Sequence, residues 1–220
     1  MTKPRVGIFG LTGCAGDQLV ILNCEDELLQ LVELLDIRSF LMASSESDDS
    51  CELDVAMVVG AVVTEHDEKV LRAVRDRSTL LVALGTCAAW GGIAGVKPLR
   101  SYVTVDAIIT GCPIEKEEFL AAIANLLNGQ LPVAAAYPVC AECKMRENEC
   151  LLLARGAFCC GPVTAAGCAA RCPSVGVACI GCRGPARDAN FAGARALFTQ
   201  LGFPDNDIQT RLNSFAAGVA

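Results

Sequence analysis

The chain has 220 residues, is 53% hydrophobic and carries a formal net charge of −7. This length allows one medium-sized domain with a small appendage, and the apolar content is sufficient for a hydrophobic core. The acidic balance argues against nucleic acid as a partner, because binding to phosphates requires a basic surface.

The first 128 residues alternate between strand and helix patterns. An alternation of this kind predicts an open α/β sheet, and we expect flavodoxin-like topology. The strand at 54–59 is almost entirely apolar, as buried parallel strands are. We predict strands at 6–9, 37–42, 54–59, 79–84 and 105–110, and helices at 17–35, after Thr64 and at 115–127.

Three further predictions concern particular residues of the helices. Thr64 is expected to cap its helix, with Glu68 and Arg72 paired one turn apart. His66, the only histidine, is expected to be an exposed residue of the first turn rather than a metal ligand. The helix at 17–35 is expected to turn one face inward, formed by Leu28, Leu31, Val32 and Leu35.

Nothing in the sequence predicts export or membrane insertion. The opening residues lack a charged-then-apolar leader, so we expect a cytoplasmic protein. The uncharged stretch 119–141 is interrupted by Asn125, Asn128 and Gly129, and is therefore expected to be a helix end, a turn and a short apolar segment rather than a membrane span.

The chain has 14 cysteines, nine of them between Cys140 and Cys182. Thiols at such spacings form disulfides, bind zinc or bind iron–sulfur clusters. Disulfides are the least favoured of these, because a cytoplasmic chain keeps its thiols reduced and dense cysteines there usually bind metal.

Three cysteines outside this dense region follow predicted strands. Cys14, Cys87 and Cys112 each have a nearby glycine, directly after the first, fourth and fifth strands. Loops at the carboxyl ends of parallel strands gather at one sheet edge, where ligands bind. We therefore expect these three thiols to meet, with glycines that let the backbone approach a bulky inorganic group.

Asp17 is the fourth candidate ligand at this edge, in a C-x-x-D arrangement where C-x-x-C would be expected. A carboxylate can bind iron, although it is a harder ligand than a thiolate. The alternative is that Asp17 caps the helix that it begins, a common role for aspartate. The sequence leaves both roles open.

The dense region holds eight further candidate ligands, enough for two sites of four. It contains a C-x-x-C pair and the element C-x-x-x-C-P, which recurs in two-cluster ferredoxins where one cysteine binds the other cluster. Zinc is the alternative, but the region has no histidine and a third cluster-like site lies in the same chain. The two sets are Cys140, Cys143, Cys150 and Cys159, and Cys168, Cys172, Cys179 and Cys182, with exchange of one cysteine left open.

Three cysteines remain outside these sets. Cys24 is expected on the apolar face of the first helix, buried in the protein core, and Cys51 lies in a polar loop with no evident role. Cys160 adjoins Cys159, and either of the two could be the ligand.

The order of these elements resembles the small, electron-transferring subunit of NiFe hydrogenases, closest to the cytoplasmic group 3 branch of deazaflavin-reducing, methyl-viologen-reducing and sulfhydrogenase systems. The resemblance covers about residues 5–185 and favours Cys159 over Cys160 as the ligand. Among its matching pieces are Leu11–Gly16, Ala83–Ile93, Gly111–Pro113, Cys140–Cys143 and Cys168–Gly184, and Gly-Thr-Cys-Ala-x-x-Gly-Gly within Ala83–Ile93 is specific to this group.

The resemblance implies a three-part organisation. A flavodoxin-like domain at 1–136 would carry a proximal 4Fe-4S cluster, and a small ferredoxin-like domain at 137–185 would carry medial and distal 4Fe-4S clusters. A helical tail would occupy 186–220. A NiFe centre is expected in a partner large subunit, and a flavin- or iron–sulfur-containing subunit is expected to accept the electrons. No catalytic residue is expected on this chain, since it shows no nucleophile–base constellation.

Two other functions compete with this one. A complex I-type subunit would relay electrons without hydrogen chemistry, but such relatives carry adjacent cysteines after the first strand, where this chain has only Cys14. A free-standing ferredoxin-like carrier or a zinc-bearing scaffold would not need an α/β domain with its own thiol site.

Overall fold

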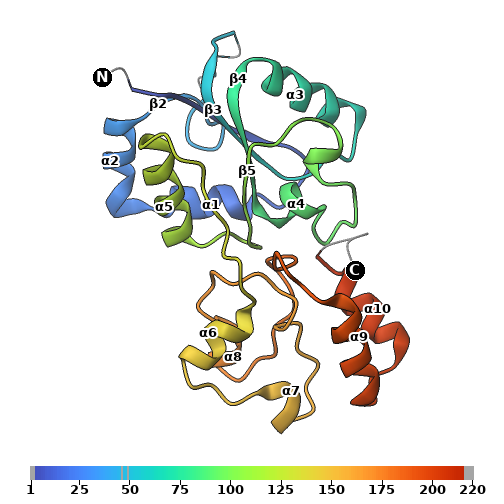
Figure 1. Cartoon of the computed structure of the whole chain (residues 1–220). Coiled ribbons are helices and arrows are strands. Elements are labelled where there is room, and N and C mark those ends of the chain that lie inside the picture. The colour runs from blue at the N-terminus through green and yellow to red at the C-terminus, as the bar shows by residue number, and fades with distance from the viewer. Residues whose placement is uncertain (1–2, 46, 49, 216–220) are drawn as a thin grey trace. The chain divides into compact units, whose positions relative to one another are not determined.

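The computed structural model describes residues 3–45, 47–48 and 50–215, without the side chain of Leu28 (Figure 1). The chain divides into two compact units, Met1–Val133 and Ala134–Ala220. No described helix has both the length and the apolar character needed to cross a membrane.

The first unit is built on a five-stranded parallel sheet with the order β2-β1-β3-β4-β5. This is the flavodoxin-like strand order, as predicted. β3 pairs with both β1 and β4, with Val6 opposite Val55 and Val59 opposite Leu84. The strands are β1 (Arg5–Gly10), β2 (Asp36–Ser39), β3 (Leu53–Val59), β4 (Ser78–Leu84) and β5 (Ala107–Ile109).

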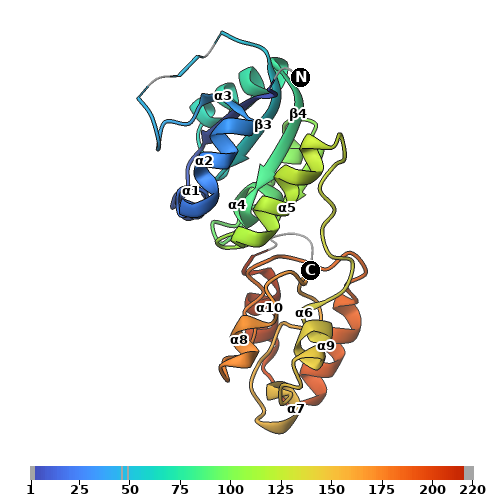
Figure 2. The same cartoon turned by 90° about the vertical axis from the view of Figure 1, so that its left-hand side faces the viewer.

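Helices cover both faces of this sheet, and each face has its own hydrophobic core. One core joins β-strand side chains such as Met57 to α1 (Gly16–Leu22), α2 (Glu25–Leu34) and α5 (Lys116–Leu127). The other joins side chains such as Leu81 to α3 (Glu65–Asp76), α4 (Gly85–Trp90) and the 3-10 turn η1 (Leu99–Ser101). Figure 2 shows α1, α2 and α5 in front of the sheet, with α3 behind it.

The predicted helix 17–35 is wrong as a single element, because it is two helices, α1 and α2. The break falls at Asn23, which ends α1, and Cys24, which precedes α2. Three acidic residues in the first turn of α2 favour a new helix start, since its amide end carries partial positive charge. Leu31 and Leu35 are buried as expected, but Val32 is half exposed, and the Leu28 side chain is not described.

Other local predictions agree with the structure. Thr64 and Asp67 form a reciprocal capping box at the start of α3, and Arg72 pairs with Glu68 at 2.6 Å. His66 is exposed. Asn128 and Gly129 end α5 as predicted.

The second strand is shorter than expected, because Phe40 begins a turn in which its carbonyl accepts the N–H groups of Ala43 and Ser44.

The described part of the second unit contains short helices and isolated bridges but no strand. One bridge joins Pro138 to Ala165 and another joins Thr164 to Pro185. The ferredoxin-like fold stays a prediction. The helices are α6 (Val139–Met145), α7 (Leu151–Ala154), α8 (Arg171–Ser174), α9 (Phe191–Gln200) and α10 (Asp205–Asn213).

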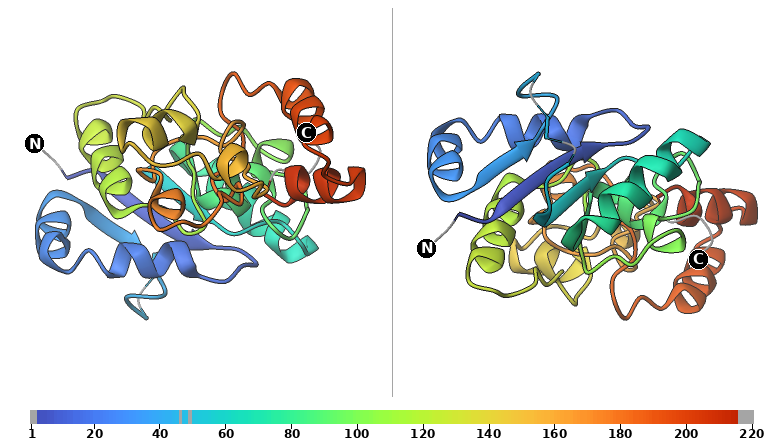
Figure 3. Two further views of the ribbon diagram at one scale, coloured as in Figure 1. Left: turned by 90° about the horizontal axis from the view of Figure 1, so that it is seen from below. Right: turned by 90° about the horizontal axis from the view of Figure 1, so that it is seen from above.

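The helical tail belongs to this second unit. Figure 3 shows α9 and α10 as a pair, and Phe198 and Ile208 pack in one core with Leu152 and Val163 of the cysteine-rich segment. The centroid of the Phe158 ring lies 4.4 Å from that of Phe198, in a tilted arrangement, and 4.8 Å from that of Phe203, in an edge-to-face arrangement. α9 begins later than the predicted residue 186, because the Asn190 side chain caps it by accepting the N–H of Gly193.

Candidate functional site

The three cysteines predicted at the sheet edge all follow carboxyl ends of strands. Cys14 lies in the exposed loop between β1 and α1, and Cys87 lies on α4, directly after β4. Cys112 is exposed in the loop after β5. In an open parallel sheet these loops share one edge, which places the three thiols on the same side of the unit.

Direct contacts tie the three loops together. The N–H of Thr86 donates to the Gly111 carbonyl at 2.8 Å, and the N–H of Gly111 donates to the Thr86 hydroxyl at 3.1 Å. These bonds join the Cys87 helix to the residue before Cys112. A methyl group at Gly16 would lie 3.4 Å from Cys14 Sγ and 3.7 Å from Pro113 Cβ, so the first loop also reaches the third.

Glycines leave room for the sulfur and carboxylate groups at this edge. A methyl group at Gly85 would overlap the Asp17 carboxylate, and one at Gly92 would lie 2.5 Å from Cys87 Sγ. Both glycines have positive φ, 84° and 55°, a conformation that other residues rarely adopt. The backbone therefore approaches the candidate ligands more closely than any side chain would allow.

Asp17 does not cap α1. The N-cap position is Ala15, and Asp17 Oδ1 accepts the N–H of Ile114, 97 residues later in the chain, at 2.9 Å. The carboxylate is buried, which raises its pKa from 3.8 to about 6, although the Ile114 hydrogen bond opposes this change. The structure thus removes the capping role and places a carboxylate among the three thiol loops.

Electrostatics shows which of these groups lie close together. Burial raises the pKa of the Cys87 thiol, and the charges of Asp17 and Cys14 raise it further. The N–H of Ile93 acts in the opposite direction. Asp17 and Cys14 therefore lie close enough to Cys87 for their charges to act on its thiol, and the Thr86–Gly111 bonds hold the backbone next to Cys112 beside Cys87.

The first four cysteines of the second unit also gather. Burial and the charges of Cys159, Cys143 and Cys150 raise the pKa of Cys140 to about 11. A methyl group at Gly161 would lie 3.3 Å from Cys140 Sγ and 3.5 Å from Cys159 Sγ. These contacts bring together the set that the sequence grouped first.

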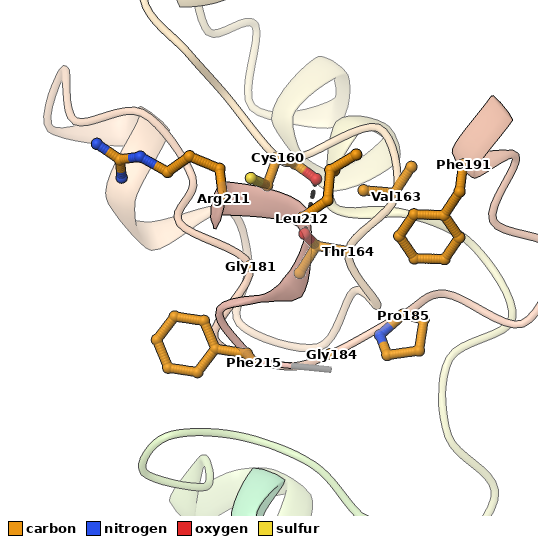
Figure 4. Close-up of a pocket in the computed structure, with 10 residues that line it drawn as sticks. All are labelled: Cys160, Val163, Thr164, Gly181, Gly184, Pro185, Phe191, Arg211, Leu212 and Phe215. Carbon is orange, nitrogen blue, oxygen red and sulfur yellow. Dashed lines mark hydrogen bonds between the residues drawn. The ribbon is translucent and has the colours of Figure 1, made fainter. Parts of the chain in front are cut away.

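The side chains of Cys159 and Cys160 lie in different surroundings. Cys160 is buried in a small apolar cavity beside Leu212, and its carbonyl accepts the Thr164 hydroxyl at 2.6 Å (Figure 4). Burial, with the charge of Cys159, raises the pKa of Cys160 to about 12. Cys159 lies beside Cys140 instead, which supports Cys159 as the ligand.

Some of the last four candidate cysteines contact members of the first four. The N–H of Cys179 donates to Cys159 Sγ at 3.3 Å, and Cys179, Cys143, Cys159 and Cys168 share one small hydrophobic cluster. Cys172 lies on α8, and Cys182 lies in the turn that the Gly184 N–H closes onto the Gly181 carbonyl. The possible exchange of one cysteine between the two sites therefore stays open.

Cys24 and Cys51 lie outside these groups. Cys24 is fully buried in the core under α1 and α2, as predicted. Cys51 packs against the core on the opposite face of the sheet, and its thiol lies 3.5 Å from the Asp48 carbonyl.

Two side chains beside the candidate ligands were not evident from the sequence. Burial, the larger effect, raises the pKa of the Cys179 thiol, and its contact with the Thr164 side chain lowers it. Glu142 accepts the N–H groups of Gly167 and Ala170, which flank Cys168. A charged residue between two candidate ligands was the one available signal for Glu142.

The donor chemistry fits iron–sulfur clusters. Among the described residues, no three Cys, Asp, Glu or His side chains are close enough to bind a single ion. A zinc ion requires its sulfurs about 2.3 Å away, whereas a cluster spaces its thiolates around a larger body. Several of these thiols have raised pKa values, so metal binding must release their protons.

Residues 14–126 match the protein family described as NADH ubiquinone oxidoreductase, 20 Kd subunit. Sulfhydrogenase 2 subunit delta of Pyrococcus furiosus is 42% identical over 236 aligned residues, covering 96% of this chain and 99% of the relative. The chain therefore belongs to the family described as NADH ubiquinone oxidoreductase, 20 Kd subunit. The predicted resemblance to group 3 NiFe hydrogenase subunits is thereby confirmed.

A second relative supports the same placement. A subunit of the F420-non-reducing hydrogenase vhu of Methanocaldococcus jannaschii is 31% identical, covering 87% of this chain and 85% of the relative. Both relatives are hydrogenase subunits by name, which favours the hydrogenase prediction over the complex I-type alternative.

The fold is shared with a solved hydrogenase. A chain in the structure of H2-activated, anaerobically purified Dm. baculatum NiFeSe hydrogenase superposes with a TM-score of 0.66. The match covers 99% of this chain and 100% of that one, at 16% identity. The likeness establishes a common architecture along nearly the whole chain.

Proposed function

We propose that this chain is the electron-relay small subunit of a cytoplasmic NiFe hydrogenase. The observation that carries the proposal is the gathering of Cys14, Asp17 and Cys87 at the sheet edge. It occurs in a chain whose relatives along almost its full length are hydrogenase subunits. The density of cysteines at metal-binding spacings supports a cytoplasmic location, because dense cysteines in a reducing compartment usually bind metal.

The chain is proposed to hold three 4Fe-4S clusters. The sheet unit would bind the proximal cluster, and the second unit would bind the medial and distal clusters. The proposed ligands are Cys14, Asp17, Cys87 and Cys112 for the proximal cluster, Cys140, Cys143, Cys150 and Cys159 for the medial cluster, and Cys168, Cys172, Cys179 and Cys182 for the distal cluster, with one cysteine open to exchange between the last two.

The chain's own contribution would be to position the clusters and to tune their reduction potentials. Bound clusters would supply one-electron oxidation and reduction. Gly85 and Gly92 leave room at the sheet edge, while the Cys179 N–H donates to Cys159 Sγ. Hydrogen bonds to sulfur and burial set cluster potentials, so these groups are proposed to tune the relay.

Two partners are proposed. A large subunit with a NiFe centre would cleave hydrogen or form it, and a flavin- or iron–sulfur-containing subunit would exchange electrons with this chain. The names of the relatives, one a sulfhydrogenase subunit and the other a subunit of an F420-non-reducing hydrogenase, support a multisubunit assembly.

Metal content tests the cofactor proposal directly. Protein isolated without air is expected to contain about 12 iron and about 12 labile sulfide per chain, from three four-iron clusters. A content of about four to eight would remove at least one cluster, and zinc in place of iron would contradict the proposal.

Replacing Cys87 tests the proximal site. Cys87→Ser is expected to abolish hydrogen-dependent reduction of an acceptor dye by the complex while the electron paramagnetic resonance signals of the other clusters remain. Cys51→Ser is the matched control, because Cys51 lies in the β2–β3 connection, apart from this edge. Undiminished turnover in Cys87→Ser would contradict the proximal assignment.

Asp17 is tested by its spectroscopic effect. Asp17→Ala is expected to change the proximal-cluster spectrum, because the carboxylate faces the thiol loops rather than its own helix end. An unchanged spectrum in an iron-replete complex would limit Asp17 to holding the Ile114 backbone.

A complex I-type relay is the second candidate, favoured by the description of the matching family. The co-purifying partner distinguishes the two functions. A hydrogenase partner is expected to contain nickel and paired C-x-x-C motifs near both of its ends, and a partner without nickel would favour the relay without hydrogen chemistry.

A further inference from the structure

Glu142 occupies an unusual position in the second unit. It lies on α6 between the candidate ligands Cys140 and Cys143, but its carboxylate turns toward a different segment. Oε1 accepts the N–H of Gly167 at 2.8 Å, and Oε2 accepts the N–H of Ala170 at 3.1 Å. One carboxylate thus joins the helix of one candidate site to the loop of the other.

The loop that receives this carboxylate is strained. Ala169 and Ala170 are consecutive non-glycine residues with φ of 52° and 49°, and Gly167 before them has φ of 120°. Side chains disfavour this left-handed region, so surrounding contacts must hold it. The N–H groups of Gly167 and Ala170 both donate to the Glu142 carboxylate, so this carboxylate is one of the contacts that hold the loop.

The same loop carries Cys168. Glu142 Oε2 lies 4.0 Å from Cys168 Sγ, and its negative charge acts on that sulfur. The N–H groups of Ala170 and Arg171 and the charge of Arg183 act on it with the opposite sign. Arg183 is buried, and its Nε donates to the Ala165 and Ala166 carbonyls.

We propose that Glu142 is a positioning residue that holds the Cys168 loop in its strained form and lowers the reduction potential of the cluster that Cys168 binds. The inference rests on the proposed function, because it requires that Cys168 binds a cluster. A negative charge beside a ligand sulfur disfavours the added electron of the reduced state. Glu142 would therefore make that cluster harder to reduce than it would be without this charge.

Glu142→Gln is the main test, carried out on the intact complex. The substitution preserves the shape of the side chain but removes its charge and one of its two hydrogen-bond acceptors. The signal of the relevant cluster is first assigned by its change in Cys168→Ser. At a fixed potential, the ratio of reduced to oxidised cluster is expected to rise about tenfold in Glu142→Gln, equivalent to about 59 mV for one electron. Amide hydrogen exchange at Gly167 and Ala170 is expected to accelerate.

Two further variants separate charge from fold. Glu149→Gln is the matched control, since it removes a charge that is exposed and paired with Arg155, and the potential is expected to stay unchanged. Glu142→Asp keeps the charge but shortens the reach, so it is expected to recover most of the potential while the amide exchange stays fast. If Glu142→Gln fails to assemble, Glu142→Asp still gives a potential and an exchange rate.

The outcomes distinguish this inference from the proposed function. A complex without iron would overturn the proposed function and the inference with it. An iron-replete Glu142→Gln or Glu142→Asp complex with wild-type potential and wild-type amide exchange would overturn the inference alone. An equal shift in Glu149→Gln would also overturn it, because the effect would then be one of net charge.

Discussion

The two units of this chain bury their apolar residues in different ways. The sheet unit has two extensive cores, one on each face, filled by side chains such as Met57 and Leu81. The described part of the second unit has two small clusters, and one of them consists largely of cysteines, including Cys143, Cys168 and Cys179. The candidate ligands of the second unit are thus also part of its interior.

This difference indicates what each unit needs in order to fold. A five-stranded sheet covered by helices on both faces can bury enough surface by itself. A unit with short helices and with thiols in its interior resembles small domains that metal binding stabilises. We therefore expect the first unit to tolerate the loss of iron and the second to lose its structure.

Iron removal is the largest expected effect. Treatment with a chelator under reducing conditions is expected to unfold 134–190 while the sheet unit persists, because the cluster-binding free energy also stabilises the fold around it. Limited proteolysis with mass spectrometry should show cleavage in the cysteine-rich segment and an intact fragment near residues 3–133. Equal protection of both units would contradict this difference.

A core substitution should affect the sheet unit alone. Leu81→Ala is expected to lower its free energy of unfolding by about 2–5 kcal/mol, because Leu81 is fully buried and its loss leaves a cavity. Trp90, the only tryptophan, lies on α4 and reports on this unit through its fluorescence in urea. Leu29→Ala is the control, since Leu29 is 77% exposed. A matching loss in Leu29→Ala would contradict the argument from burial.

Asp67 should have a smaller effect that depends on pH. Burial alone would raise its pKa, but hydrogen bonds from Thr64, Val63 and Thr12 outweigh burial and lower the pKa from 3.8 to about 2. Asp67→Asn is expected to cost the iron-free sheet unit about 1–3 kcal/mol at pH 7.

The sign of the Asp67 effect follows from linkage. Because its pKa is depressed in the folded state, the ionised group stabilises the fold above pH 3.8, and this stabilisation is lost as the pH falls through about 2. The difference between wild type and Asp67→Asn in Trp90-monitored unfolding should therefore be constant above about pH 4 and shrink toward pH 2. A constant difference down to pH 2 would show that the charge has no part in it.

The surface pair of α3 gives the smallest expected effect. Glu68 and Arg72 form an exposed pair one helical turn apart, at 2.6 Å. Glu68→Ala is expected to cost the sheet unit less than about 0.5 kcal/mol, and less still in high salt, because water and ions screen exposed charges. A loss above about 1 kcal/mol in the same fluorescence measurement would mean that the pair does more than join two surface charges.

Sequence patterns predicted the sheet unit well because its central strands, β3 and β4, are nearly continuous apolar runs that each end at a glycine. They missed the break at Asn23 and Cys24, where the signal was a cluster of acidic residues rather than a proline or glycine. They placed Cys14, Cys87 and Cys112 at strand ends, since topology alone decides this. The Asp17–Ile114 bond and the Glu142 contacts depend on side-chain directions across distant segments, which periodicity does not encode.

The packing of α10 against the cysteine-rich segment has a consequence for biosynthesis. Ile208 and Leu212 complete a core with Leu152 and Val163, so this core cannot close until ribosomes have released residues far downstream of the cysteines. The sheet can fold while translation continues, whereas the core around Leu152 and Val163, which flank several of the thiols, stays open until α10 has emerged. Delivery of iron to the proposed ligands would compete with thiol oxidation during this interval, and cells limited in iron supply are expected to accumulate chains with a finished sheet and modified thiols.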